Sequence, residues 1–275
     1  MEPQRHTVFS DFGPGAELAA WLATPPGRYL LAWEQSRVDQ VVGDLFGFHA
    51  LQLGLCALDA LRCNRMPHRW CASDHLDLVS TPDVAPPAAL ALHCDFDALP
   101  FPAASIDLVV LPHTLEFARD AHRTLREVER VLVPEGRVVI FGFNAASLWG
   151  LRQRGGRLRR RLGGARDTFL PRDGEFIGYW RLRDWLRLLS FEVEGGRFGC
   201  YAPPLTSQRW LQRWAWMDRV GDRWWPVFGA VYSLVAVKRV RGMRLVGLAR
   251  ETRRRTKAAA AVVANRRRDL HRDPQ

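Results

Sequence analysis

Cysteine and lysine are scarce in this chain. Its five cysteines are odd in number and none forms a CxxC pair, which argues against both a zinc site and a disulfide framework. The sequence therefore predicts no metal site and favours a reducing, cytoplasmic environment. Only Lys238 and Lys257 are lysines, so 38 of the 40 basic residues are arginine.

Long apolar runs are also missing. Residues 1–15 contain no apolar core of signal-peptide length, and the longest apolar run, 227–237, is too short to span a bilayer. We therefore expect no transmembrane segment, and a protein that is soluble or at most peripheral to a membrane.

The net charge of +11 is distributed unevenly. Residues 241–275 carry eleven basic residues against three acids, and residues 151–166 carry seven arginines and no acid. A chain of 275 residues that is 47% apolar can form one large α/β domain. We predict such a domain over residues 1–240, with insertions or cover at 145–180 and 200–228. The basic tail that follows, 241–275, is predicted to be disordered.

Alternating strands and helices fill the domain. Short apolar segments predict strands at 49–55, 69–74, 89–95, 107–111 and 137–143. A helix is predicted over 28–46, and a second begins at its cap Asp120, presents Ala121, Leu125, Val128 and Leu132 on one face, and stops at Pro134. Residues 145–180 are predicted to be an irregular, arginine-rich insertion. A short helix around 182–189 and strands at 191–199 and 231–237 complete the pattern.

The stretch from Asp95 to Phe143 contains an acid followed by LPF (Asp95 and 99–101) and the segment VLVPEGRVVIFGF (131–143). In these motifs the chain resembles the type 11 group of class I S-adenosylmethionine-dependent methyltransferases. The resemblance implies a doubly wound, Rossmann-like sheet of seven strands whose last strand is inserted antiparallel. It also implies S-adenosyl-L-methionine as cofactor and a bacterial subgroup with a degenerate first motif.

The first motif of this family is an acid followed by GxGxG, and Gln52, Gly54, Cys56 and Leu58 occupy its four positions. Only one glycine remains, and non-glycine residues in left-handed backbone cost roughly 1–2 kcal/mol. Weaker cofactor affinity is thus expected. We predict cofactor contacts at Gln52, Gly54 and Cys56.

Further cofactor contacts are implied at the ends of the second and third strands. Asp74 corresponds to the acid that accepts the ribose hydroxyls, with Asp77 as the competing assignment and an exposed loop acid as the alternative. Asp95 corresponds to the acid that accepts the adenine amino group, and Phe96 to the residue that flanks the ring. The alternative for Asp95 is a turn acid that binds local amides.

His113 follows the fourth strand, where relatives contact the methionine part of the cofactor. It is a candidate base because its unperturbed pKa lies near neutrality, although a histidine at a strand end is more often structural. The aromatic stretch 210–225 predicts an acceptor pocket, an interfacial surface or, preferably, a helix packed over the sheet edge.

The sequence thus predicts an S-adenosylmethionine-dependent methyltransferase for a small-molecule, lipid or RNA acceptor that it does not identify. The alternative is a catalytically silent relative that binds RNA or anionic membrane through its arginines. Segments 151–166 and 241–275 are the candidates for weak polyanion or membrane-surface contact. A nicotinamide oxidoreductase is disfavoured because no GxGxxG follows the first strand.

Overall fold

A computed structural model describes residues 14–74, 90–161, 169–171 and 174–240. These described residues form one compact unit. The predicted tail, 241–275, lies outside the described residues, as does Asp77.

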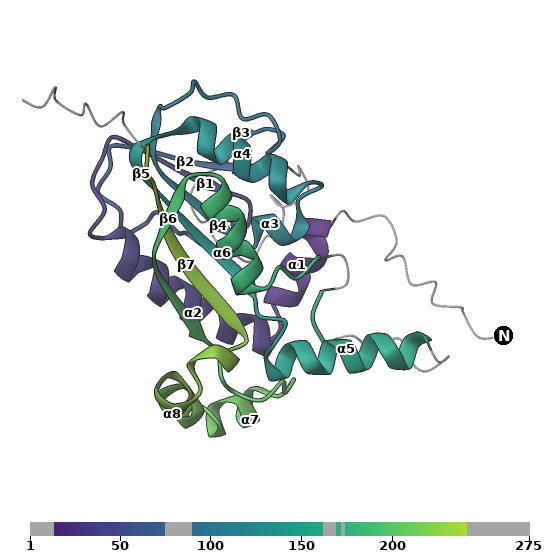
Figure 1. Cartoon of the computed structure of the whole chain (residues 1–275). Coiled ribbons are helices and arrows are strands. Elements are labelled where there is room, and N and C mark those ends of the chain that lie inside the picture. The colour runs from purple at the N-terminus through teal and green to yellow at the C-terminus, as the bar shows by residue number, and fades with distance from the viewer. Residues whose placement is uncertain (1–13, 75–89, 162–168, 172–173, 241–275) are drawn as a thin grey trace, which may run out of the picture. The chain divides into compact units, whose positions relative to one another are not determined.

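The core is a sheet of seven strands in the order β3-β2-β1-β4-β5-β7-β6 (Figure 1). β1, β2, β3, β4 and β5 are parallel, and β7 pairs antiparallel with both β5 and β6. This confirms the predicted Rossmann-like fold with its last strand inserted antiparallel. The strands are β1 His49–Leu53, β2 His68–Ser73, β3 Leu90–His93, β4 Ile106–Pro112, β5 Leu132–Phe143, β6 Phe191–Gly199 and β7 Val231–Lys238.

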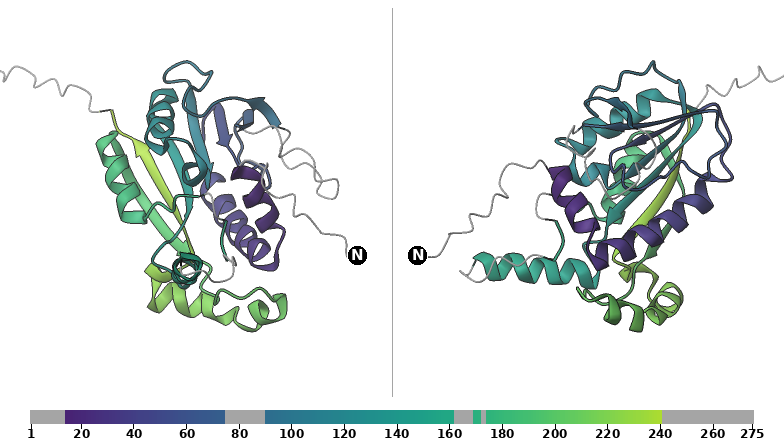
Figure 2. Two further views of the ribbon diagram at one scale, coloured as in Figure 1. Left: turned by 90° about the vertical axis from the view of Figure 1, so that its right-hand side faces the viewer. Right: turned by 180° about the vertical axis from the view of Figure 1, so that it is seen from behind.

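Helices cover both faces of this sheet. The helices are α1 Pro14–Leu22, α2 Pro25–Val42, α3 Thr114–Phe117, α4 Ala121–Val131, α5 Leu148–Arg161, α6 Tyr179–Leu188, α7 Gln208–Arg213 and α8 Trp216–Trp224, with a 3-10 turn at Pro226–Phe228. Figure 2 shows α1 and α2 on one face and α4 and α6 on the other. Side chains of the central strands alternate between the two layers: Leu108 and Val110 pack with α2, whereas Val109 and Leu111 pack with α4.

Local signals explain the two best-defined helices. Thr24 caps α2, whose first residues are Pro25 and Pro26, so the helix begins earlier than the predicted residue 28. Asp120 caps α4 as expected: its Oδ1 accepts hydrogen bonds from the amides of His122 and Arg123. Leu132, predicted to lie on the apolar face of that helix, instead begins β5.

The insertion predicted to be irregular contains a helix, α5. Ser147 caps it by accepting a hydrogen bond from the amide of Gly150 at 3.1 Å. Trp149 anchors its first turn, because its indole donates to the carbonyl of Ala202 at 2.8 Å inside the core. Leucine and arginine favour helix strongly enough to offset its three glycines, Gly150, Gly155 and Gly156.

The connection between β1 and β2 differs from a usual crossover. Residues 54–67 contain neither helix nor strand, although parallel strands are usually joined through a helix.

Among the described residues, no helix combines the length and apolarity needed to cross a membrane.

Candidate functional site

The predicted cofactor residues follow neighbouring strand ends. Because β3, β2, β1 and β4 are adjacent and parallel, their carboxyl ends meet at one edge of the sheet. This edge is where ligands bind in doubly wound folds. Gly54, Asp74, Asp95 and His113 all lie directly beyond these strands.

Gly54 makes the turn out of β1 in the left-handed region, with φ +75°. A Cβ at this position would lie 3.2 Å from Oγ1 of Thr114 and 3.7 Å from the ring of Phe96. The backbone conformation therefore favours glycine, and a Cβ would also be tight against Thr114. Leu55 follows with φ 33°, a conformation that non-glycine residues adopt only under strain.

The Gln52 side chain is fully buried and holds the loop that follows. Its Nε2 donates to the carbonyls of Leu58 at 2.7 Å and Leu55 at 3.0 Å, while its Oε1 accepts from the amide of Ala60 at 3.0 Å. A carboxylate could not donate to those carbonyls. Glutamine in place of the family's acid therefore explains why residues 54–60 keep a compact turn without a helix.

The other two positions of the first motif carry side chains that pack inside the protein. Leu58 is buried in the apolar layer on the α2 face. Sγ of Cys56 lies 3.1 Å from Sγ of Cys71 on β2. A hydrogen bond from Cys71 lowers the pKa of the Cys56 thiol. Two positions that are glycine in a GxGxG motif therefore carry side chains here, and both side chains pack against the protein itself.

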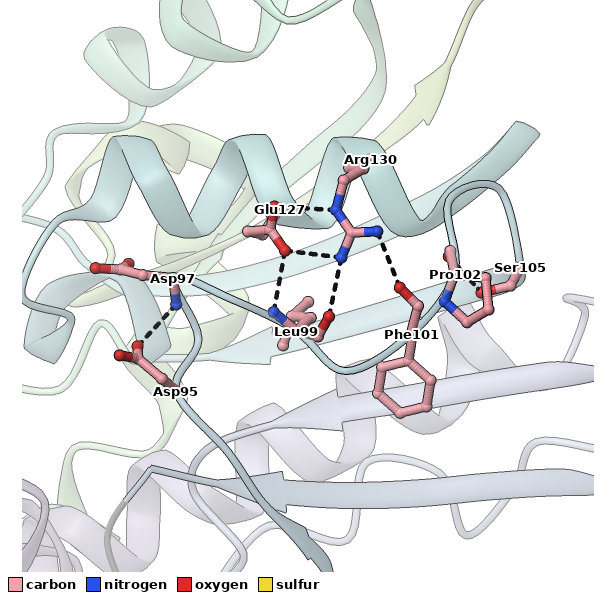
Figure 3. Close-up of polar contacts among 8 residues, drawn as sticks. All are labelled: Asp95, Asp97, Leu99, Phe101, Pro102, Ser105, Glu127 and Arg130. Atoms are coloured by element: carbon pink, nitrogen blue, oxygen red, sulfur yellow. Dashed lines mark hydrogen bonds and ion pairs between the residues drawn. The ribbon is translucent and has the colours of Figure 1, made fainter.

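The two acids follow neighbouring parallel strands: Asp74 comes directly after Ser73 of β2, and Asp95 comes two residues after His93 of β3, with which Ser73 pairs. Burial raises the pKa of the Cys94 thiol to about 11, and the charges of Asp74 and Asp95 add to that shift. Asp74 is half-buried and Asp95 is exposed. Asp95 accepts a hydrogen bond from the amide of Asp97 at 2.9 Å through its Oδ1 (Figure 3), the local turn contact that the sequence left as the alternative. A carboxylate has acceptor capacity beyond one such bond.

The loop after Asp95 is fastened to α4 by an ion pair that sequence analysis missed. Glu127 and Arg130 pair at 2.8 Å. Glu127 accepts from the amide of Leu99, and Arg130 donates to the carbonyls of Leu99 and Phe101, each at 2.9 Å (Figure 3). This pair fixes the LPF turn beside the site. The only sequence signal is an acid and an arginine three residues apart on one helix.

Phe96 is 5% exposed and packs in the layer that contains α4. Its ring also borders Gly54. Phe96 therefore lies at the predicted crevice, with its side chain already largely covered.

His113 is held between two buried carboxylates. Its Nδ1 lies 2.7 Å from Glu116 and its Nε2 lies 2.7 Å from Glu34 of α2. Burial by itself lowers the pKa of His113, but Glu34 and Glu116 outweigh it and raise that pKa to about 10. A protonated imidazole with both nitrogens engaged cannot accept a proton, so this geometry favours a structural role.

The same cluster joins four elements. Glu116 follows His113 in α3, and its Oε1 accepts from the amide of Phe143 at the end of β5 at 2.6 Å. Burial raises the pKa of Glu116. Glu34 was not singled out from the sequence, yet it is the acid in the otherwise apolar series Leu30, Glu34, Val38, which is the signal of a buried charge.

A cavity of about 300 Å³ lies elsewhere, between α2, β6 and α8. Trp33, Arg37, Arg197 and Tyr201 are among its lining residues, and none of the predicted cofactor residues lines it. No cluster of metal-ligating side chains is found within the described residues.

Comparison with known proteins gives one family match and one curated relative. Residues 74–140 match the methyltransferase domain model Methyltransf_11. The uncharacterized protein YafS of Escherichia coli (strain K12) is 36% identical over 173 residues, which are 63% of this chain. The chain spans 65% of the length of that relative.

Solved structures share the fold at low identity. A methyltransferase from Thermotoga maritima that depends on S-adenosylmethionine has a TM-score of 0.56 and 15% identity, over 82% of this chain and 95% of its own. A chain of the Haloferax volcanii complex that contains the Trm112 methyltransferase activator has a TM-score of 0.54 and 18% identity, over 84% and 99%. Residues 74–140 thus match a methyltransferase domain, and the described chain shares its fold with solved class I methyltransferase structures.

Proposed function

We propose that this protein transfers a methyl group from S-adenosylmethionine to an acceptor, and that it binds the cofactor at the edge formed by Gly54, Asp74, Asp95 and Phe96. The family match supports methyl transfer. The observation that carries the site is that Asp74 and Asp95 follow β2 and β3, two adjacent parallel strands in which Ser73 pairs with His93.

These residues fit the adenosine half of the cofactor. A carboxylate at Asp74 offers two acceptor oxygens to two neighbouring ribose hydroxyls, and Asp95 offers an acceptor to the adenine amino group. Gly54 carries no side chain, which suits close approach of a ligand to its backbone. When bound, S-adenosylmethionine supplies an activated methyl group, and positioning of the acceptor does most of the remaining work.

The fit to the amino-acid half is poorer. Gln52 is fully engaged with its own loop, Cys56 contacts Cys71, and Leu58 is buried. We therefore expect binding that is weaker than a complete glycine motif would give and that depends chiefly on Asp74 and Asp95. We assign His113 to holding Glu34 and Glu116 rather than to catalysis.

A thermal-shift titration with S-adenosylmethionine and with S-adenosylhomocysteine tests this proposal. A ligand at one hundred times its Kd stabilises the folded state by about 2.7 kcal/mol, which raises Tm by about 5–10 °C for a domain of this size. Asp74→Asn and Asp95→Ala should each reduce the shift. Asp44→Ala, in the exposed turn after α2, is the matched control and should preserve it. An unchanged Tm at millimolar ligand would refute the proposal.

Because Gln52, Cys56 and Leu58 of the first motif contact the protein itself, a second candidate is a methyltransferase-fold protein without catalytic activity. Its expected behaviour is the absence of any shift with either ligand while the protein remains folded. Equal shifts in the wild type and in both site variants would instead indicate binding at another position.

A further inference from the structure

The segment between β6 and β7 forms a separate surface. It leaves the sheet at Gly199 and returns at Val231, two residues that pair across the strands. Helices α7 and α8 and the 3-10 turn fill this segment and lie together at one end of the sheet (Figure 1). Since Val231 also pairs with Phe143, this is the edge at which the parallel strand β5 ends.

The large apolar side chains of this segment are exposed to an unusual degree. Trp224 is 70% exposed and Phe228 is 58% exposed, whereas Trp149 in the core is 1% exposed. The other members are about half exposed: Trp210, Trp216, Trp225 and Val227. We call these six residues the tryptophan surface. In α7 and α8 only Leu211 and Gly221 are buried. The prediction of a helix packed over the sheet edge therefore does not account for these tryptophans.

The spacing along α8 explains the exposure. Trp216, Val220 and Trp224 recur every four residues and so lie along one side of the helix. Gly221, which packs against the ring of Tyr201, lies on the buried side. The helix therefore fastens to the protein through a glycine and directs its largest apolar groups outward. Exposed apolar patches of this kind mark interaction surfaces.

The charge of the segment is positive toward solvent. Residues 200–230 contain four arginines (Arg209, Arg213, Arg219 and Arg223) and two acids. Asp218 accepts hydrogen bonds from the hydroxyl of Tyr29 and the amide of Tyr201. Asp222 pairs with Arg197 of β6 at 2.9 Å. Both acids are thus bonded to groups outside the segment's helices, and the arginines interleave with the tryptophans.

We propose that the tryptophan surface docks on an anionic lipid bilayer. Its tryptophans and Phe228 would enter the boundary between headgroups and acyl chains, and its arginines would bind lipid phosphates. Tryptophan prefers this boundary because its ring is apolar and its N–H is polar. The docked helices lie along the membrane without crossing it.

Charge argues against a second copy of the chain as the occupant. A two-fold dimer through this surface would bring the same patch of each copy together, so arginines would face arginines at a cost in free energy. The exposed aliphatic Val227 beside Phe228 also fits an acyl environment better than stacked bases, which use aromatic faces.

Docking here would place the carboxyl edge of the sheet near the lipid. The acceptor of the proposed methyl transfer would then be an amphiphilic molecule held in the membrane, an inference that rests on the proposed function. The docking itself does not depend on catalysis, because the surface lies on α7, α8 and residues 225–228, outside the predicted cofactor residues.

Vesicle binding by the full chain tests the proposal. Vesicles of phosphatidylcholine alone are compared with vesicles that also contain phosphatidylglycerol, and some carry brominated acyl chains that quench tryptophan fluorescence on contact. We expect binding to the anionic vesicles, with quenching. Trp224→Gln with Trp225→Gln should weaken binding by about tenfold or more, because burial of one large apolar side chain is worth at least that factor.

The matched control is Trp180→Gln, since Trp180 on α6 is 55% exposed but lies outside the tryptophan surface. It should change vesicle binding less than twofold. All variants keep residues 241–275, so any contribution of the basic tail cancels. The measurement contains no S-adenosylmethionine, and its result is therefore separate from the test of cofactor binding.

Three results would overturn the proposal. They are equal vesicle binding by the wild type and the double variant, a dimer in light scattering that the double variant abolishes, and RNA binding that the double variant abolishes while vesicles remain unbound.

Discussion

The buried cluster of Glu34, His113 and Glu116 gives the most demanding prediction for stability. Replacing His113 by asparagine removes the cation between two carboxylates, each 2.7 Å from the ring. Asparagine is chosen because His113 has φ 57°, a left-handed conformation that asparagine tolerates. Backbone strain is therefore not added to the loss of the ion pairs.

The expected loss follows from burial of all three groups. Removing one partner of a buried ion pair destabilises a protein by about 3–5 kcal/mol, because the remaining charge is left without compensation. For a domain of this size the loss lowers Tm by about 6–20 °C. It is a large share of a typical unfolding free energy of about 5–15 kcal/mol.

The cluster also makes stability depend on pH. The pKa of His113 is raised from 6.5 to about 10 in the folded protein. The folded state thus keeps a proton that the unfolded chain releases, and the stabilisation is complete below about pH 6.5 and is lost as the pH rises toward about 10. The raised pKa of Glu116 acts in the same direction, because the folded state again binds more protons.

Urea unfolding followed by tryptophan fluorescence measures both effects. The free energy of unfolding should fall between about pH 6.5 and about pH 9.5 in the wild type. The triple variant Glu34→Gln, His113→Asn, Glu116→Gln contains no titrating group in the cluster, so its slope gives the background. A wild-type slope no steeper than that background, or a His113→Asn loss below about 1 kcal/mol, would refute an imidazolium held between carboxylates.

Two further predictions concern the loops at the site. Arg130→Met should lower the free energy of unfolding by about 1–2 kcal/mol, because the carbonyls of Leu99 and Phe101 lose a charged, partly exposed donor. The control Arg126→Met, exposed on the same helix, should lower it by less than about 0.5 kcal/mol in chemical denaturation. Equal losses in the two variants would contradict the role of Arg130. Glutathione disulfide should oxidise Cys56 and Cys71 to a disulfide and be reduced to two glutathione molecules. The Cys56 thiolate can attack glutathione disulfide, and the two cysteine sulfurs lie 3.1 Å apart. Peptide mapping should show the linked pair, and recovery of both cysteines as mixed disulfides or free thiols would contradict this prediction.

The sequence predicted well the features that depend on neighbouring residues. Asp120 followed by an amphipathic pattern was enough to place α4, and short apolar runs placed the parallel strands. The antiparallel insertion of β7 came from family resemblance, since no local pattern encodes strand order. The helix α5 was missed because its glycines and dense arginines obscured the cap at Ser147.

The details of the site depend on contacts between distant residues, and these were not predictable. The amide of Gln52 bonds to loop carbonyls only because the chain turns back at Gly54. The interpretation of His113 as a candidate base did not take account of Glu34, which lies 79 residues away in the sequence. Burial and charge, rather than residue type, decide what such a histidine can do.

Titration calorimetry with S-adenosylhomocysteine tests the central claim most directly. The account predicts saturable binding at a single site in the wild type, marked weakening in Asp74→Asn and Asp95→Ala, and unchanged binding in Asp44→Ala. Heat no greater than dilution for the folded wild type at millimolar ligand would contradict it.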